Sequence, residues 1–416
     1  MTRTNDLRQE LRHAVFLQRA ADLAPTSAEA RLGQGAFLAL RFVDLLAPGL
    51  DVEADAFRYQ HAATERYCRE ISGGSAEAAH LLGLVDSSMA AGQSGDVGHV
   101  VPGMLAYAHY LEDAGHYDEA LDVLDALARV GGGRLGAADA VALALRVARV
   151  NRKLARFDAA DAAYGEAGSR AAAAGDVFSR LLSRIGQANT ALGRGNLAGA
   201  EGSYREILAD ARTARFREAE ARTEHGLGST LQMRGDAGEG LRHIWRAFEL
   251  YEDESSRMRA LNDAAILLLA LGHAGAAERA LLKVLRHASH ADNRHNALIE
   301  LMHCASFRRD QVGFQRWHGE CLTRVPEMTP SILTDFYLKA GIGQARFSRV
   351  RQAEELLRKA LETARSHDLH EYEFRVERVL AGLGDCAAQE HATAAESPVE
   401  NEQAKSVAES AAALVV

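Results

Sequence analysis

The sequence predicts an all-α protein built as an α-solenoid, a stack of helical hairpins. Each repeat has a small residue, a turn residue seven positions later, a second small residue after five more, and then apolar residues four and seven positions further on. The residues at the second small position follow one another at intervals of 40, 40, 40, 37, 37 and 39 residues: Ala120, Ala160, Ala200, Gly240, Ala277, Phe314 and Ala353, of which only Phe314 is large. Such a period is typical of stacked helical arrays, because each repeat can bury its apolar face only against its neighbours.

Length and composition favour the same fold class. The chain has 416 residues, more than one ordinary core accommodates, yet no stretch rich in Pro, Gly and Ser divides it into compact domains. Only 6% of the residues are aromatic, while alanine, the strongest helix former, is abundant. The six prolines fall in expected loops or first turns, so no expected helix is interrupted.

The N-terminal part is expected to close one end of the array. Residues 5–24 and 28–46 have the pattern of amphipathic helices. Residues 55–70 and 76–89 follow as a degenerate repeat, in which Ala78 takes the anchor position. We therefore expect residues 1–96 to form an N-terminal cap.

Residues 97–385 are expected to hold about seven hairpins and a final capping helix at 371–383. The clearest hairpin runs from Ile185 to Leu208, where Gly195 supplies a turn residue that can adopt a positive φ. After residue 385 the chain is rich in Ala, Glu, Ser and Gln, a composition too polar to bury a core, so we expect residues 386–416 to be disordered.

The repeats resemble the tetratricopeptide (TPR) family. In that family a small residue stands at position 8, a turn residue at 15, alanine at 20 and apolar residues at 24 and 27. Here position 8 is held by Ala108, Ala148, Ala188, Gly228, Ala265, Met302 and Gly341. The family's Trp at position 4 and Pro at 32 are absent, and the longer period is similar to that of kinesin light chains and many bacterial regulators. The resemblance covers residues 102 to about 363 and implies a right-handed superhelix.

The resemblance also implies a binding groove. The first helix of each repeat would face the concave side through positions 2, 5, 9, 12 and 13, one helical face. The candidate groove residues on or beside this face are Arg146, Arg149, Arg152, Lys153, Arg184, Asn189, Arg222, His225 and Asn262. Arginine suits carboxylates because it can donate two hydrogen bonds at once, and asparagine can pair with the backbone of an extended peptide. The alternative is that these are ordinary solvated helix residues.

Several classes of function are disfavoured by the sequence. The net charge of -9 and the pI near 6.0 argue against general nucleic-acid binding. No apolar run is long enough to cross a membrane. The four cysteines lack metal or redox spacing, which favours a reduced, cytoplasmic protein. The histidine group His287, His290, His295 and His303 fits no compact zinc pattern.

We therefore expect a scaffold that binds an extended peptide or a partner helix in its groove, with no cofactor, no metal and no enzymatic activity. The ligand would be acidic or carry a free C-terminal carboxylate. The protein's own C-terminal tail, which is acidic and ends in Leu414, Val415 and Val416, is a further candidate ligand. The alternative function is a regulator whose superhelix tightens on a small peptide and changes its grip on an effector. An enzyme is the third class, but the sequence carries no recognisable catalytic motif.

Overall fold

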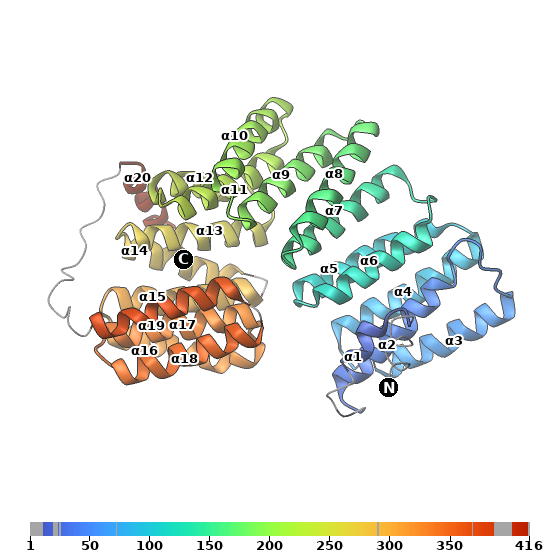
Figure 1. Cartoon of the computed structure of the whole chain (residues 1–416), viewed down its shortest axis with the longest axis horizontal. Coiled ribbons are helices and arrows are strands. Elements are labelled where there is room, and N and C mark those ends of the chain that lie inside the picture. Colours follow the sequence, from blue (N-terminus) through green and yellow to red (C-terminus); the bar gives the residue numbers. More distant parts are fainter. Residues whose placement is uncertain are drawn as a thin grey trace, which may run out of the picture. The chain divides into compact units, whose positions relative to one another are not determined.

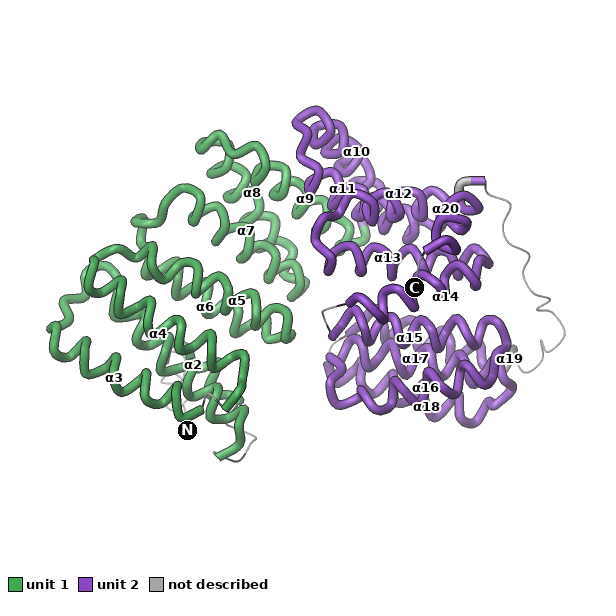
Figure 2. The backbone as a smooth tube through the Cα atoms, turned by 180° about the vertical axis from the view of Figure 1, so that it is seen from behind, with its two compact units in different colours: residues 1–195 green, residues 196–416 purple. Residues whose placement is uncertain are grey.

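The computed structural model describes residues 11–19, 24, 26–71, 73–288, 291–367, 369–386 and 402–414. Its described part contains twenty α-helices, two short 3-10 segments and no strand (Figure 1). Contacts divide the chain into two compact units, residues 1–195 and 196–416 (Figure 2). This division falls inside the predicted array rather than at either of its predicted ends.

Unit 1 contains nine helices and one 3-10 segment among its described residues. They are α1 (Ala14–Gln18), α2 (Ala28–Asp44), α3 (Ala54–Glu70), α4 (Ala76–Ser94), η1 (Val97–Val100), α5 (Val101–Asp113), α6 (Tyr117–Gly131), α7 (Ala137–Lys153), α8 (Phe157–Ala173) and α9 (Val177–Gly193). Consecutive helices pack as hairpins, α5 on α6 and α7 on α8, and the first helices α5, α7 and α9 are also in contact.

The N-terminal end of unit 1 is held by buried ionic contacts. The guanidinium of Arg19, which follows α1, donates hydrogen bonds to Glu77 on α4 and Glu119 on α6. Tyr107 donates its hydroxyl proton to the same Glu77 at 2.8 Å. A helix of five residues has little stability of its own, so these contacts fix α1 against α4 and α6.

Unit 2 continues the hairpin pattern. Its described elements are α10 (Leu197–Ala214), α11 (Arg217–Arg234), α12 (Ala237–Leu250), α13 (Glu254–Ala270), α14 (Ala274–His287), α15 (Ala291–Phe307), α16 (Gln311–Arg324), η2 (Val325–Glu327), α17 (Pro330–Arg346), α18 (Val350–Ser366), α19 (His370–Cys386) and α20 (Glu402–Ala412). The hairpins are α11 with α12, α13 with α14, α15 with α16, and α17 with α18.

The hairpin turns follow the predicted period. The turn residue predicted for each of the seven repeats has a positive φ: Gly115, Ala155, Gly195, Gly235, Gly272, Arg309 and Ser348. Glycine enters this region without steric cost, whereas Ala155 and Ser348 accept some strain there. The helices of a hairpin approach closely where both residues are small. A Cβ atom on Gly228 would lie only 2.8 Å from the carbonyl oxygen of Gly240.

The tail departs from the sequence analysis. Disorder was expected throughout residues 386–416, and for residues 402–412 that expectation is wrong, because they form α20 beside α12 and α14 (Figures 1 and 2). The physical reason is that an alanine-rich helix cannot build a core alone but can add its small face to an apolar surface supplied by other helices. The expected tail residues 387–401, 415 and 416 lie outside the described residues.

The position of α20 also bears on the tail as a groove ligand. Both helices that it contacts, α12 and α14, are second helices of their hairpins, whereas the expected groove is lined by first helices. The described part of the tail therefore packs within its own chain, against second helices rather than against the first helices that carry the predicted groove residues.

Candidate functional site

Three predicted groove residues of unit 1 converge on one carboxylate, Glu112. Arg146 donates from Nη1 to Oε2 of Glu112 at 2.9 Å, Arg149 donates from Nε to Oε1, and Nζ of Lys153 lies 3.1 Å from the same Oε1. Glu112 stands at the end of α5, and the three cations share one face of α7. We call these four residues the Glu112 cluster.

The Glu112 cluster joins a buried anion to partly exposed cations. The side chain of Glu112 is fully buried, while those of Arg146, Arg149 and Lys153 are 25%, 35% and 26% exposed. Burial alone would raise the pKa of Glu112, but Arg149 and Lys153 outweigh it and lower that pKa to about 2. The carboxylate is therefore ionised at neutral pH.

The cations of the Glu112 cluster also compete with one another. Burial lowers the pKa of Lys153, Arg149 lowers it further, and Glu112 offsets only part of this effect. The ammonium group of Lys153 also lies over the ring of Tyr117, 5.3 Å from its centroid. Three positive charges around one negative charge form a local excess that a second anion would relieve.

Neighbouring groups moderate this excess. Nδ1 of His109 lies 3.3 Å from Nη1 of Arg146 and 3.6 Å from a carboxylate oxygen of Asp113. Burial lowers the pKa of His109, while Asp113 acts in the opposite direction. The cationic surface is therefore bordered on one side by Asp113, whose side chain is 43% exposed.

The other predicted residues of unit 1 lie on α7 and on its neighbour α9. Arg152 is on α7, and its buried Nε has no hydrogen-bond partner. Arg184 and Asn189 are on α9, which packs against α7. The structure thus brings Arg146, Arg149 and Lys153 together and places the remaining three on the same pair of helices.

The three predicted residues of unit 2 form a different arrangement. His225 is buried and bridges two partners, with Nε2 2.8 Å from Asp263 and Nδ1 3.3 Å from the hydroxyl of Tyr251. Arg222 pairs with Glu218 on its own helix at 2.7 Å. Asn262 is 6% exposed, and its buried Oδ1 has no hydrogen-bond partner. His225 and Arg222 are thus already engaged by carboxylates.

The sequence analysis missed a buried ionic cluster in unit 2, which we call the Lys339 cluster. Lys339 on α17 donates to Asp335 on the same helix at 2.6 Å and to Glu300 on α15. Burial would lower the pKa of Lys339, but Asp335 and Glu300 raise it overall, so its ammonium group stays charged. The three side chains are only 4% to 14% exposed.

A sequence signal for both clusters exists at repeat position 6, which the expected groove positions leave out. The charged residues there are Arg146, Asp263, Glu300 and Lys339. A charge that recurs on the otherwise small or apolar flank of the first helix indicates a buried ionic partner, because an isolated buried charge would be too costly.

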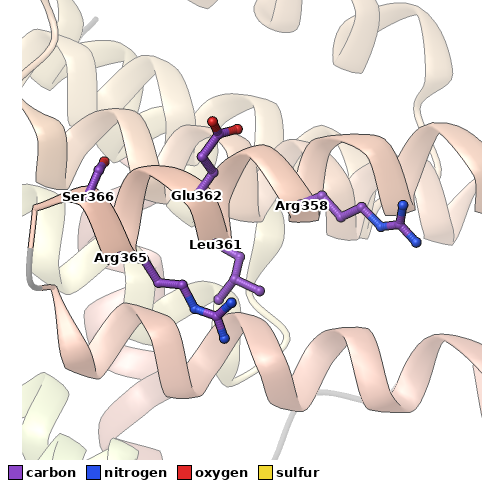
Figure 3. Close-up of a pocket in the computed structure, with 5 residues that line it drawn as sticks. All are labelled: Arg358, Leu361, Glu362, Arg365 and Ser366. Carbon is purple, nitrogen blue, oxygen red and sulfur yellow. The ribbon is translucent and has the colours of Figure 1, made fainter.

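Two surface hollows among the described residues are lined by residues other than the candidate ones. One lies on α18 beside Arg358, Leu361, Glu362, Arg365 and Ser366 (Figure 3). There Arg365 pairs with Glu373 and Glu377 of α19. A second is lined in unit 1 by Leu50, Phe57 and Arg134, among others. None of the nine predicted groove residues lines either hollow.

Two further searches concern the described residues alone. They contain no group of three or more His, Cys, Asp or Glu side chains arranged to hold a metal ion. They also contain no helix with the length and apolar character that crossing a bilayer requires.

Comparison with known proteins gives structural matches only. No protein-family model matches the chain, and no curated protein matches its sequence. One similar solved structure is the Rap conjugation gene regulator of the plasmid pLS20 in complex with a Phr peptide, with a TM-score of 0.54 and 10% identity over 83% of this chain and 96% of that one. Another is the apo form of the quorum sensor NprR from B. thuringiensis, with a TM-score of 0.52 and 13% identity over 78% of this chain and 97% of that one.

These similarities agree with the repeat period, with the turn residues of positive φ and with the paired helices. The predicted fold class is confirmed: the chain is an all-α, TPR-like repeat protein.

Proposed function

We propose that this protein binds a peptide or an extended segment of another protein through its first helices. The Glu112 cluster would hold an anionic group of that ligand, either an acidic side chain or a free C-terminal carboxylate. The observation that carries this proposal is the convergence of three partly exposed cations on one fully buried carboxylate. Arginine is well suited to the task because its planar guanidinium can donate two parallel hydrogen bonds to a carboxylate.

Two solved structures of similar fold support a peptide ligand. The plasmid pLS20 regulator is described in complex with a Phr peptide, and NprR is described as a quorum sensor. These descriptions also favour the second candidate function, a regulator whose superhelix responds to the peptide. A scaffold and a regulator differ in their response to binding. Small-angle scattering with and without peptide separates them, since only the regulator would become more compact.

The ligand class can be tested with a library of biotinylated linear hexapeptides that have free carboxyl ends. We expect bound peptides to be enriched in Asp and Glu, and their affinity to fall as salt rises, because the contact is between partly exposed charges. Selection of neutral or basic peptides whose binding does not depend on salt would contradict the proposal.

Charge reversal locates the site. Replacing Arg149 and Arg152 with Glu should abolish capture of the selected acidic peptides. The control is Arg170→Glu, because Arg170 is an exposed arginine on α8, a second helix, and pairs with Glu166 on that same helix. Circular dichroism should show unchanged helicity in all variants. If the double variant binds the selected acidic peptides as well as the wild type does, the binding site lies elsewhere in the protein.

We also propose that the protein is cytoplasmic and has no enzymatic activity. Cys68, Cys304 and Cys321 are buried, and burial raises the pKa of each thiol, which suits structural cysteines in a reducing compartment. A catalytic activity that co-purifies with the protein and is lost in site-directed variants would overturn the non-enzymatic part.

A further inference from the structure

The C-terminal helix α20 fills a groove between two second helices. One face of α20 is buried through Ala404, Val407, Ala408 and Ala411, which belong to the same apolar cluster as residues of α12 and α14. On the other side, Arg279 of α14 donates from Nη1 to the carbonyl oxygen of Ala412 at 2.8 Å and so caps the end of α20. A helix docked in this way shows that the groove accepts one.

The receiving surface differs from that of other repeats. Five residues after the anchor, the residue in the seven successive repeats is Asp125, Gly165, Arg205, Trp245, Leu282, Gly319 and Arg358. Arg205 and Arg358 are well exposed, whereas Trp245 is 9% exposed and lies, like Leu282, in the apolar cluster with α20. Large apolar residues occupy this position only in α12 and α14, the two helices that α20 contacts.

The occupant holds this groove mainly with small side chains, and Val407 and the partly buried Leu414 are its larger apolar contacts. Three of the four buried residues of α20 are alanines, which remove little apolar surface from water. The helix has eleven residues, a length at which an isolated helix is marginal in water. We therefore expect α20 to dock because it belongs to the same chain as the groove. The covalent connection raises the effective concentration of α20 at the groove.

Charge also distinguishes the two sides. The helix α14 carries Arg279, Lys283 and Arg286 against one carboxylate, Glu278, while α20 carries Glu402 and Glu409 against Lys405. The α14 side of the groove thus carries a positive excess, whereas α12 balances Arg242 and Arg246 with Glu239 and Glu249, and the occupant is slightly acidic.

We propose that the groove between α12 and α14 is a docking site for a partner protein's helix, and that α20 covers it until that helix displaces it. The partner helix is acidic and amphipathic, with small residues spaced as Ala404, Ala408 and Ala411 are, and it extends beyond the eleven residues of α20. This surface is independent of the Glu112 cluster, since it is built from second helices of unit 2.

The test uses the full chain and a fluorescein-labelled peptide of residues 400–416 as the probe. In the wild type, α20 occupies the groove and the probe binds weakly. Ala408→Glu puts a charge on the buried face, releases α20 and should tighten binding of the probe by about tenfold or more. Ser406→Glu adds the same charge on the exposed face and should leave the affinity at the wild-type value.

Receptor variants complete the test in the Ala408→Glu background. Trp245→Arg or Leu282→Arg, each of which introduces the kind of residue that α10 has at this position, should remove the gain in probe affinity. The proposal is overturned if Ala408→Glu binds the probe no better than the wild type, or if both receptor variants leave its affinity unchanged.

Hydrogen exchange of the unmodified protein gives a second measurement that needs no variant. If α20 leaves its groove independently, the amides of residues 402–414 exchange much faster than those of α12 and α14. Exchange of all three helices at one common rate would mean that α20 is a permanent part of unit 2, and would contradict the proposal.

Discussion

The Glu112 cluster of unit 1 and the Lys339 cluster of unit 2 both include a charged residue at repeat position 6, but they have opposite charge balance. Around Glu112, three cations with 25% to 35% exposure surround one buried carboxylate. Around Lys339, two carboxylates hold one ammonium group, and all three side chains are at least 86% buried. Solvent access therefore separates a surface that can accept a ligand from an ionic contact that only joins two helices.

The first test of this comparison, with the largest expected effect, is Lys339→Met. The substitution leaves Glu300 and Asp335 buried without their cation, and removal of one partner from a buried pair typically costs about 3–5 kcal/mol. Urea unfolding followed by circular dichroism measures the loss. Lys359→Met on α18 is the control, because Lys359 is exposed and its loss should change stability by about 0.5 kcal/mol or less. Equal effects of the two substitutions would show that the Lys339 cluster has no structural role.

Glu112→Gln should have the next largest effect, and one that depends on pH. The folded-state pKa of Glu112 is lowered from 4.5 to about 2. A lowered pKa means that the carboxylate stabilises the fold above pH 4.5 and that this contribution is lost as the pH falls toward 2. We expect Glu112→Gln to cost about 2–3 kcal/mol at pH 7 and to show a weaker loss of stability than the wild type between pH 4.5 and 2. Parallel stability curves for the two proteins across this range would contradict the assignment.

Arg149→Met should have the smallest effect on stability. Glu112 keeps Arg146 and Lys153, so we expect a loss of about 1 kcal/mol in urea unfolding. Arg170→Met on α8 serves as the matched control, with a change of about 0.5 kcal/mol or less. A loss comparable to that of Lys339→Met would mean that the cations around Glu112 are as indispensable to the fold as Lys339 is, and would remove the distinction between the two clusters.

Sequence periodicity was sufficient to predict the array. Small residues such as Gly228 and Gly240 recur because two helices approach closely there, and Gly115 or Gly235 recurs because the turn needs a positive φ. Both requirements concern residues within one hairpin, so small residues and glycines recur in the sequence at the repeat period. The docking of α20 produces no such recurrence, because Ala404 and Ala411 could equally belong to a solvated tail.

The candidate site was predictable in part for a related reason. The helical face that carries Arg149 and Lys153 follows from spacing alone, but the carboxylate that collects them, Glu112, comes from the preceding repeat. Likewise Arg222 reads as a groove residue, although it pairs with Glu218 on its own helix. Partners of charged side chains depend on rotamers and on neighbouring helices, which one-dimensional spacing does not determine.

The central claim, that the Glu112 cluster recognises an anionic group, is tested most directly by isothermal titration with one pair of peptides. The tightest-binding hexapeptide that contains no Asp or Glu, so that its C-terminal group is its only carboxylate, is made with a free carboxyl end and with a C-terminal amide. We predict that the amide binds at least about tenfold more weakly, a difference of about 1.4 kcal/mol, and that this difference disappears in Arg149→Met. Equal affinity of the two peptides for the wild-type protein, or an undiminished difference in the variant, would contradict the claim.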